Sequence, residues 1–236
     1  LSLHDALPIL VAAILLAIPG ILILHQPDLG TALLVFGSGF FVIFFAGLSW
    51  KVLAGLFASF LAALPVFWTL MHEYQRQRVL TLLDPSQDPL GKGFHIIQST
   101  VAVGSGGFTG KGFLQGTQTH LEFIPERTTD FIFAVLAEEF GLMGALVLLM
   151  LYTCLIVRGL VIAANAPTLF SRLLAGAISL IFFVYAFVNV GMVSGILPVV
   201  GVPLPLMSYG GTAMVTLGMG AGILMSIQNN KKLVQT

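Results

Sequence analysis

Six apolar runs dominate the sequence and limit what it can fold into. Each is close to the roughly 17–25 residues that a helix needs to cross about 30 Å of hydrocarbon. A transmembrane barrel would instead show short strands of alternating apolar and polar residues. The sequence therefore predicts an all-α, polytopic transmembrane bundle of about six helices, near residues 9–24, 30–48, 52–72, 140–160, 173–193 and 207–227.

The composition excludes an ordinary soluble enzyme. Hydrophobic residues make up 57% of the chain and charged residues only 8%, where a soluble domain carries about 25% charged residues. The net charge is zero, so no nucleic acid is expected as a partner. Cys154 is the single cysteine and lies within an apolar run, which excludes an intrachain disulfide and indicates a packing role.

A polar stretch of about 58 residues, 73–130, separates the first three runs from the last three. It is far longer than an ordinary connection, and long loops of this kind are usually functional or disordered. Apolar groups such as Phe94 and Phe108 along it argue against disorder. Lysine and arginine favour the cytoplasmic side of a membrane. We therefore expect the stretch to be extracytoplasmic and the C-terminus to be cytoplasmic, because the opposite side holds Lys51, Arg158, Arg172, Lys231 and Lys232.

These observations predict five segments. The opening residues, LSLHDALPI, contain no methionine and no signal-peptide pattern, so we interpret residues 1–8 as non-native sequence. On that interpretation, helices upstream in the native protein are missing here. Residues 9–72 are expected to form three transmembrane helices and 73–130 a large extracytoplasmic loop. Residues 131–230 are expected to form three more transmembrane helices with a re-entrant or interfacial lead-in, and 231–236 a cytoplasmic tail.

The glycine-rich segment 104–112 suggests a phosphate loop, but it lacks the residues that the nucleotide and dinucleotide patterns require. Two interpretations remain open. Its backbone amides and Lys111 could contact an anion, or the segment could be a flexible turn.

Asp130 is the candidate general base. It ends the segment Glu126–Asp130, which is predicted to lead into a helix at the membrane surface. Thr128, Thr129 or Asp130 could simply cap that helix. Alternatively, the Asp130 carboxylate lies against aromatic residues and is basic enough to take a proton from a sugar hydroxyl. Arg127 would then hold a phosphate, although its charge would also lower the basicity of Asp130.

Two further polar features lie in or beside apolar runs. Glu138 and Glu139 should face water or other helices, because burial in lipid is costly; structural and functional roles are equally open for both. The segment 199–211, VVGVPLPLMSYGG, places prolines and glycines at a helix boundary. Such a break should line a cavity or be buried in protein.

Five motifs in chain order resemble the signatures of the SEDS family, which comprises RodA, FtsW and SpoVE. Asp84-Pro85 and Gly110–Gly112 are closer to its elongation branch, RodA, than to its division branch, FtsW. The resemblance implies ten transmembrane helices in a complete member, of which this chain would contain about the last six. The motifs are QPDLGT at 26–31, YQRQR at 74–78, GSGG at 104–107, PERTTDF at 125–131 and PLPLMSYGG at 203–211.

The resemblance also implies a function. Members polymerise lipid II, an undecaprenyl pyrophosphate-linked disaccharide-pentapeptide, outside the bacterial cytoplasmic membrane, together with a class B penicillin-binding protein and, for RodA, the elongation machinery. Asp130 matches the family's catalytic carboxylate. A divalent cation, Mg²⁺ or Mn²⁺, could help to neutralise the leaving pyrophosphate. The candidate substrate-binding residues are Arg127, Lys111, Arg76, Gln98, Glu126, Asp28, Ser208 and Tyr209.

Two other functions stay open. A flippase for lipid-linked precursor would also be a polytopic helical protein with broken segments. The concentration of charge in one external loop argues against it, because a transporter places charged residues near the membrane midplane; Asp28, Glu138 and Glu139 keep it open. A non-catalytic scaffold for a penicillin-binding protein would tolerate replacement of Asp130.

Overall fold

The computed structural model describes residues 3–26, 29–47, 50–71, 73–87, 91–120 and 126–229, and all of the regular secondary structure within these ranges is helical. A helix lies at each of the six predicted apolar runs. The all-α, polytopic class is therefore confirmed. The six helices are α1 (Leu3–Leu24), α2 (Leu29–Phe45), α3 (Trp50–Leu70), α7 (Ile132–Ala164), α8 (Leu169–Val193) and α9 (Gly211–Asn229).

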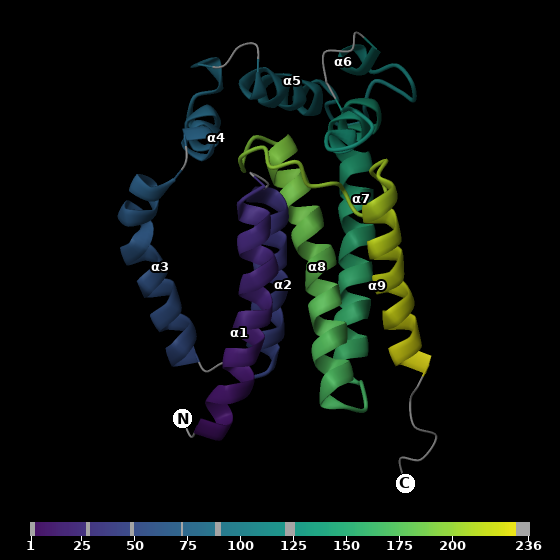
Figure 1. The fold of residues 1–236 in the computed structure, drawn as a ribbon. Helices are drawn as coiled ribbons and strands as arrows, with labels where there is room; N and C mark the ends of the chain where they lie inside the picture. Colours follow the sequence, from purple (N-terminus) through teal and green to yellow (C-terminus); the bar gives the residue numbers. More distant parts are fainter. Residues whose placement is uncertain are drawn as a thin grey trace.

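Four of these helices are long and apolar enough to cross a membrane: α3, α7, α8 and α9. The α1 and α2 helices contribute shorter apolar stretches, Ile14–Ile23 and Gly30–Phe45. In Figure 1, α1, α2, α7, α8 and α9 run side by side as a bundle, whereas α3 stands apart from it. None of the residues in the apolar window of α3 is buried.

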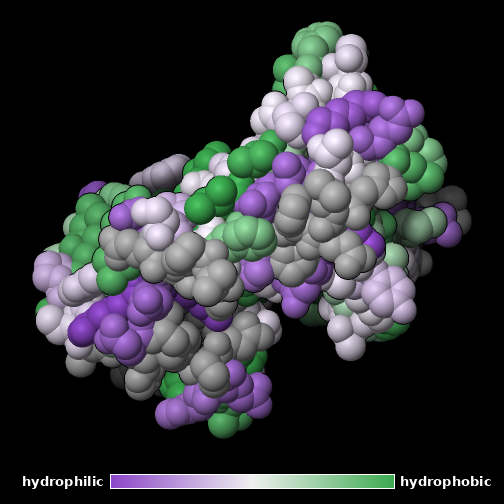
Figure 2. Space-filling model, turned by 90° about the horizontal axis from the view of Figure 1, so that it is seen from above, coloured by the Kyte–Doolittle hydropathy of each residue, from purple (hydrophilic) through white to green (hydrophobic). Residues whose placement is uncertain are grey.

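The long polar stretch is itself largely helical, which its composition did not predict. It contains α4 (Glu73–Leu83), the short 3₁₀ helix η1 (Pro85–Gln87), α5 (Lys92–Ser105) and α6 (Thr117–His120). These elements gather over one end of the bundle (Figure 1). Seen from that end, hydrophilic residues form several patches among hydrophobic ones (Figure 2).

The α7 helix begins before its predicted start near residue 140 and is broken at Gly141. Gly141 has φ 64° and ψ −160°, which is not a helical conformation. The predicted start therefore coincides with the break, because the apolar run becomes continuous only beyond it.

The glycine-rich segment is hydrogen-bonded to α7 on both sides of this break. Before it, the amides of Lys111 and Gly112 donate to the carbonyl oxygens of Glu138 and Glu139, at 3.1 and 2.9 Å. Beyond it, the amides of Leu142 and Met143 donate to the segment's own carbonyl groups at 2.9 and 3.2 Å. The segment is therefore not a loose turn, and the amides of residues 111 and 112 are not available to an anion.

Close approach of the two backbones requires residues without a Cβ. A Cβ at Gly106 would overlap the carbonyl oxygen of Ala137, and one at Gly110 would overlap that of Glu139. By contrast, a Cβ at Gly104 meets nothing within 4 Å.

We predict that Gly106→Ala lowers the thermal stability of the purified protein, while Gly104→Ala does not. Gly106 has φ −68° and ψ −22°, so alanine fits its backbone and only the clash with α7 is tested. Overpacking of this kind costs about 1–3 kcal/mol, whereas alanine at helical Gly104 should be neutral or slightly stabilising. Thermal unfolding in detergent measures both. Equal melting temperatures for the two variants would contradict the close packing of this segment on α7.

Candidate functional site

The segment that leads to Asp130 is held by hydrogen bonds to three successive carbonyl oxygens. The amide of Tyr209 donates to Thr128 at 2.8 Å, and the hydroxyl of Ser208 donates to Thr129 at 2.6 Å. The side-chain amide of Asn189, on α8, donates to Asp130 at 2.8 Å. The position of Asp130 is therefore fixed by its backbone, which leaves its carboxylate available for other interactions.

The predicted break before α9 is partly buried in the protein. Val202 and Leu204 are each 1% exposed. The side-chain amide of Asn189 also donates to the carbonyl oxygen of Val202 at 2.7 Å. The hydroxyl of Tyr152, on α7, donates to the backbone carbonyl oxygen of Pro205 at 2.7 Å. These bonds satisfy carbonyl groups that cannot be paired within a helix.

The capping hypothesis for residues 128–130 is wrong. Phe131 occupies the N-cap position of α7, and no side chain caps the helix there. The hydroxyl of Thr129 instead donates to the carbonyl oxygen of Glu126 at 3.1 Å. The hydrophobic contacts of Phe131, which is 3% exposed, fix the start of the helix without a polar cap.

The surroundings of Asp130 raise the pKa of its carboxyl group above the ordinary value. Burial is the largest cause, followed by the negative charge of Glu126 and a side-chain hydrogen bond with Glu126. The positive charge of Arg127 was expected to lower this pKa, but the pKa is raised. Gly201, with φ +74°, borders the carboxylate, and a Cβ there would lie 3.2 Å from Asp130 Oδ2. One face of the carboxylate is thus bordered by a residue without a side chain.

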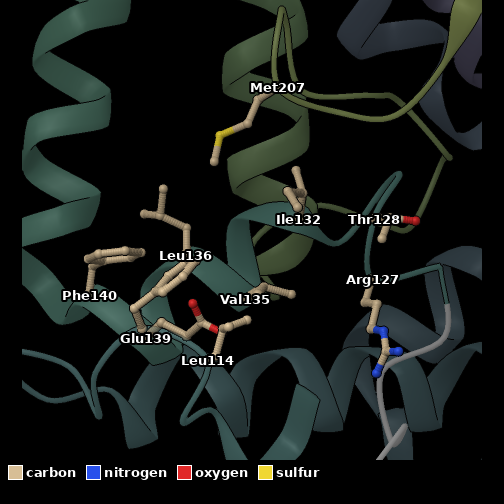
Figure 3. A pocket seen from close by; sticks show the side chains of 10 residues that line it. Leu114, Arg127, Thr128, Ile132, Val135, Leu136, Glu139, Phe140 and Met207 are labelled. Carbon is tan, nitrogen blue, oxygen red and sulfur yellow. The ribbon is translucent and has the colours of Figure 1, made fainter. Parts of the chain in front are cut away.

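A cavity of about 420 Å³ adjoins this segment. Its walls are mostly apolar, and Arg127, Thr128 and Glu139 provide its polar groups (Figure 3). The remaining lining residues are Phe113, Leu114, Ile132, Val135, Leu136, Phe140 and Met207.

The buried Glu138 and the partly exposed Lys111 form an ion pair. Glu138 is 0% exposed, and its Oε1 lies 2.7 Å from Lys111 Nζ. The same oxygen accepts hydrogen bonds from the backbone amide of Gln118 at 2.9 Å and the hydroxyl of Thr117 at 3.2 Å. The structure therefore gives Glu138 a structural role and places Lys111 beside it.

The other predicted residues lie at several places. Arg76 donates from Nε to Trp68 and from Nη2 to Thr69, at 2.9 Å each, and so binds the last turn of α3. This α3–α4 junction lies on the other side of the bundle from α7 (Figure 1). Gln98 is half-buried on α5, and among the described residues no hydrogen bond connects its side chain to the 126–130 segment. Asp28 lies outside the described residues.

Ser208 and Tyr209 differ in exposure although they are adjacent. Ser208 is 4% exposed and bonded to Thr129, whereas Tyr209 is 82% exposed. A metal site was also expected to be possible, but no group of three or more His, Cys, Asp or Glu residues suited to a metal ion occurs within the described ranges.

Sequence analysis missed Asn189 and did not select Glu139. Asn189 is 0% exposed and joins Asp130 to Val202. The sequence did contain a signal for Asn189, because a lone asparagine inside the apolar run 173–193 is a polar residue at membrane depth. Glu139 was left undecided between a structural and a functional role.

Residues 2–233 match the model of the FtsW/RodA/SpoVE family of cell cycle proteins. The chain is similar to the peptidoglycan glycosyltransferase MrdB of Escherichia coli K12, with 60% identity over 225 residues, which are 95% of this chain and 61% of MrdB. The chain thus spans about three fifths of the length of that relative.

Two solved structures are also similar. One is a chain from a peptidoglycan synthase complex that coordinates polymerization and crosslinking, with TM-score 0.77 and 38% identity, covering 94% of this chain and 62% of that chain. The other is the rod shape determining protein RodA of Thermus thermophilus, with TM-score 0.59 and 31% identity, covering 94% of this chain and 57% of that chain.

We predict that Lys111→Met lowers stability by about 3 kcal/mol, because it removes the positive charge that pairs with the buried Glu138 carboxylate. The double variant Lys111→Met/Glu138→Leu should recover part of this loss, because it removes both charges. Thermal unfolding of the two variants and the native protein measures the difference. A double variant less stable than Lys111→Met alone would contradict the assignment of Glu138 as a charge that needs Lys111.

Proposed function

The chain belongs to the FtsW/RodA/SpoVE family, and we propose that it functions as a peptidoglycan glycosyltransferase that polymerises lipid II during cell elongation. The observation that carries the proposal is Asp130, a half-buried carboxylate of raised pKa held on a fixed backbone. The name and 60% identity of MrdB support the reaction class. Because the chain spans about three fifths of MrdB, the activity is proposed for the whole protein.

In the proposed reaction, Asp130 acts as general base. Its ionised carboxylate accepts the proton of the acceptor sugar hydroxyl while that oxygen attacks the anomeric carbon of the donor. The bond from this carbon to the pyrophosphate oxygen breaks, and undecaprenyl pyrophosphate leaves. A raised pKa makes the carboxylate a stronger base than an exposed aspartate. A single displacement inverts the anomeric carbon, so an α-linked donor gives a β-linked glycan.

Arg127 is the cation that the geometry favours for the pyrophosphate. The leaving group is already acidic, so it needs neutralisation of charge more than a proton. Arg127 lies three residues before Asp130, and of the three candidate cations it is the one that lines the cavity. No step in this scheme passes through a metal ion.

We also propose that α4, α5 and α6 lie outside the cytoplasmic membrane and that the C-terminus is cytoplasmic. Lys51 begins α3, Arg158 lies near the end of α7 and Arg172 near the start of α8. These helix ends are opposite α4–α6 in Figure 1, which agrees with the preference of basic residues for the cytoplasm. A class B penicillin-binding protein within the elongation machinery is the proposed partner. The similarity to a chain of a synthase complex that polymerises and crosslinks supports it.

We predict that Asp130→Asn abolishes glycan polymerisation and preserves the fold. The bond from Asn189 is to the backbone carbonyl oxygen of Asp130, so the amide replacement removes the base without removing that support. Polymerisation from purified lipid II by the full-length protein with its penicillin-binding partner measures activity, and thermal unfolding checks the fold. Equal polymer from both proteins would exclude Asp130 as the base. An absence of polymer from both would favour a flippase or a scaffold.

We predict that Glu126→Gln moves the rising limb of the pH–activity profile to lower pH. Both effects of Glu126 on Asp130 raise its pKa, so removing them lowers the pKa, and the base becomes ionised at a lower pH. The control is Glu73→Gln on α4, which removes the same negative charge on the other side of the bundle. The profile of kcat/KM against pH measures the shift. Identical shifts in both variants would show a general charge effect instead.

A further inference from the structure

We propose that Glu139 is a sugar-binding residue of the cavity beside Arg127. Its carboxylate would accept hydrogen bonds from hydroxyl or amide N–H groups of the saccharide carried by the lipid-linked substrate. The inference rests on the proposed function and deepens it, because the mechanism above gives Glu139 no role.

The first argument is the burial of Glu139 without a polar partner. The residue is 5% exposed, and no hydrogen bond or ion pair joins its carboxylate to the part of the chain that the structure describes. Polar groups sealed inside a protein are almost always hydrogen-bonded, whereas the Glu139 carboxylate lines the cavity, from which a ligand can reach it. A buried carboxylate that faces a cavity is therefore suited to receive its donors from a ligand.

The second argument is the contrast with Glu138. These two residues are adjacent on α7, yet Glu138 is satisfied by Lys111, Thr117 and the amide of Gln118. Glu139 contacts the glycine-rich segment only through its carbonyl oxygen, which accepts from Gly112 at 2.9 Å. The same hydrogen-bonded segment thus fixes the backbone of both residues, but Glu139 lines the cavity and Glu138 does not. Figure 3 shows the Glu139 side chain among the lining residues.

The third argument is the chemistry of the cavity. Its volume of about 420 Å³ lies within the range of about 300–1,000 Å³ that is usual for ligand pockets. Figure 3 shows the Glu139 carboxylate beside Leu114 and Val135, with Arg127 across the cavity. A carboxylate only accepts hydrogen bonds, and a guanidinium only donates them. A ligand that suits both must combine an anionic group with neutral donors, and a sugar pyrophosphate does so.

The apolar walls also suit this ligand. Phe113, Phe140 and Met207 line the cavity and offer surfaces on which the C–H faces of a sugar ring or the start of a lipid chain can pack. A simple inorganic anion would gain nothing from these walls and would be repelled by Glu139.

The test compares two probes that differ only in the sugar. One is a short-chain polyprenyl pyrophosphate carrying the disaccharide, and the other is the same polyprenyl pyrophosphate without sugar. Binding of each to the purified full-length protein in detergent is measured for the native protein and the variants. We expect Glu139→Gln to weaken binding of the sugar-bearing probe about tenfold or more, as for hydrogen bonds to a charged group. It should not weaken binding of the bare probe, because the bare pyrophosphate is repelled by the Glu139 carboxylate and gains no hydrogen bond from it.

Three variants serve as comparisons. Arg127→Gln should weaken both probes, because it removes the contact with phosphate. Glu138→Gln should lower the melting temperature without changing the ratio of the two affinities. Glu139→Asp retains the charge but withdraws the carboxylate by one methylene group, so it should also weaken the sugar-bearing probe selectively. If Glu139→Gln does not fold, Glu139→Asp provides the test of sugar binding.

An equal loss for both probes, or no loss for either, would overturn the assignment of Glu139 to the sugar. The outcome is separable from the proposed function. If the native protein polymerises lipid II while Glu139→Gln binds both probes normally, only the role of Glu139 fails. If binding depends on the sugar through Glu139 but the native protein and its partner form no polymer, only the proposed function fails.

Discussion

Non-helical backbone inside a helical membrane bundle needs hydrogen-bond partners from the protein, and Asn189 provides them where two such segments meet. Its side-chain amide donates both to Asp130 and to Val202. Ser208 and Tyr209 extend this connection to Thr129 and Thr128. The segment before α7 and the segment before α9 thus hold each other in place. Without these bonds, the carbonyl groups of Thr128, Thr129, Asp130 and Val202 would lack these partners, and lipid could not replace them.

The glycine-rich segment provides a second support of the same kind on the other side of α7. The break at Gly141 interrupts the helical hydrogen bonds, and residues 107–112 form bonds with α7 on both sides of the break. The Lys111–Glu138 ion pair then fixes the segment by its side chain as well. Because of this arrangement, adjacent glutamates on one helix have different surroundings: one is satisfied by the protein, and the other faces the cavity.

The sequence predicted the helices well because their constraint is a simple one, the length and apolarity needed to cross a membrane. The sequence also selected Asp130 and Arg127, through the specific motif PERTTDF, and their roles stay predictions. It did not predict the helices of 73–130, since α4 and α5 are short and carry no long apolar run. The role of the 104–112 segment was also missed. Its glycines allow close contact with α7, which begins 20 residues later. The local sequence does not reveal such a contact. Glu138 and Glu139 could not be distinguished for the same reason, because Lys111 and Thr117 come from outside α7.

A general base and an anion-binding cation are needed close together, although each weakens the other when they are in contact. Arg127 and Asp130 are three residues apart, yet the pKa of Asp130 is raised by burial and Glu126. The fixed backbone between them explains how both functions can be retained. Thr128 and Thr129 are bonded through their carbonyl groups, so Arg127 lines the cavity while the carboxylate of Asp130 lies beside Gly201. Glu126 adds a second negative charge near Asp130. Arg127, from the same segment, lines the cavity. In the proposed mechanism, the hydrogen bonds from Asn189, Ser208 and Tyr209 to the backbone of residues 128–130 position both charged groups.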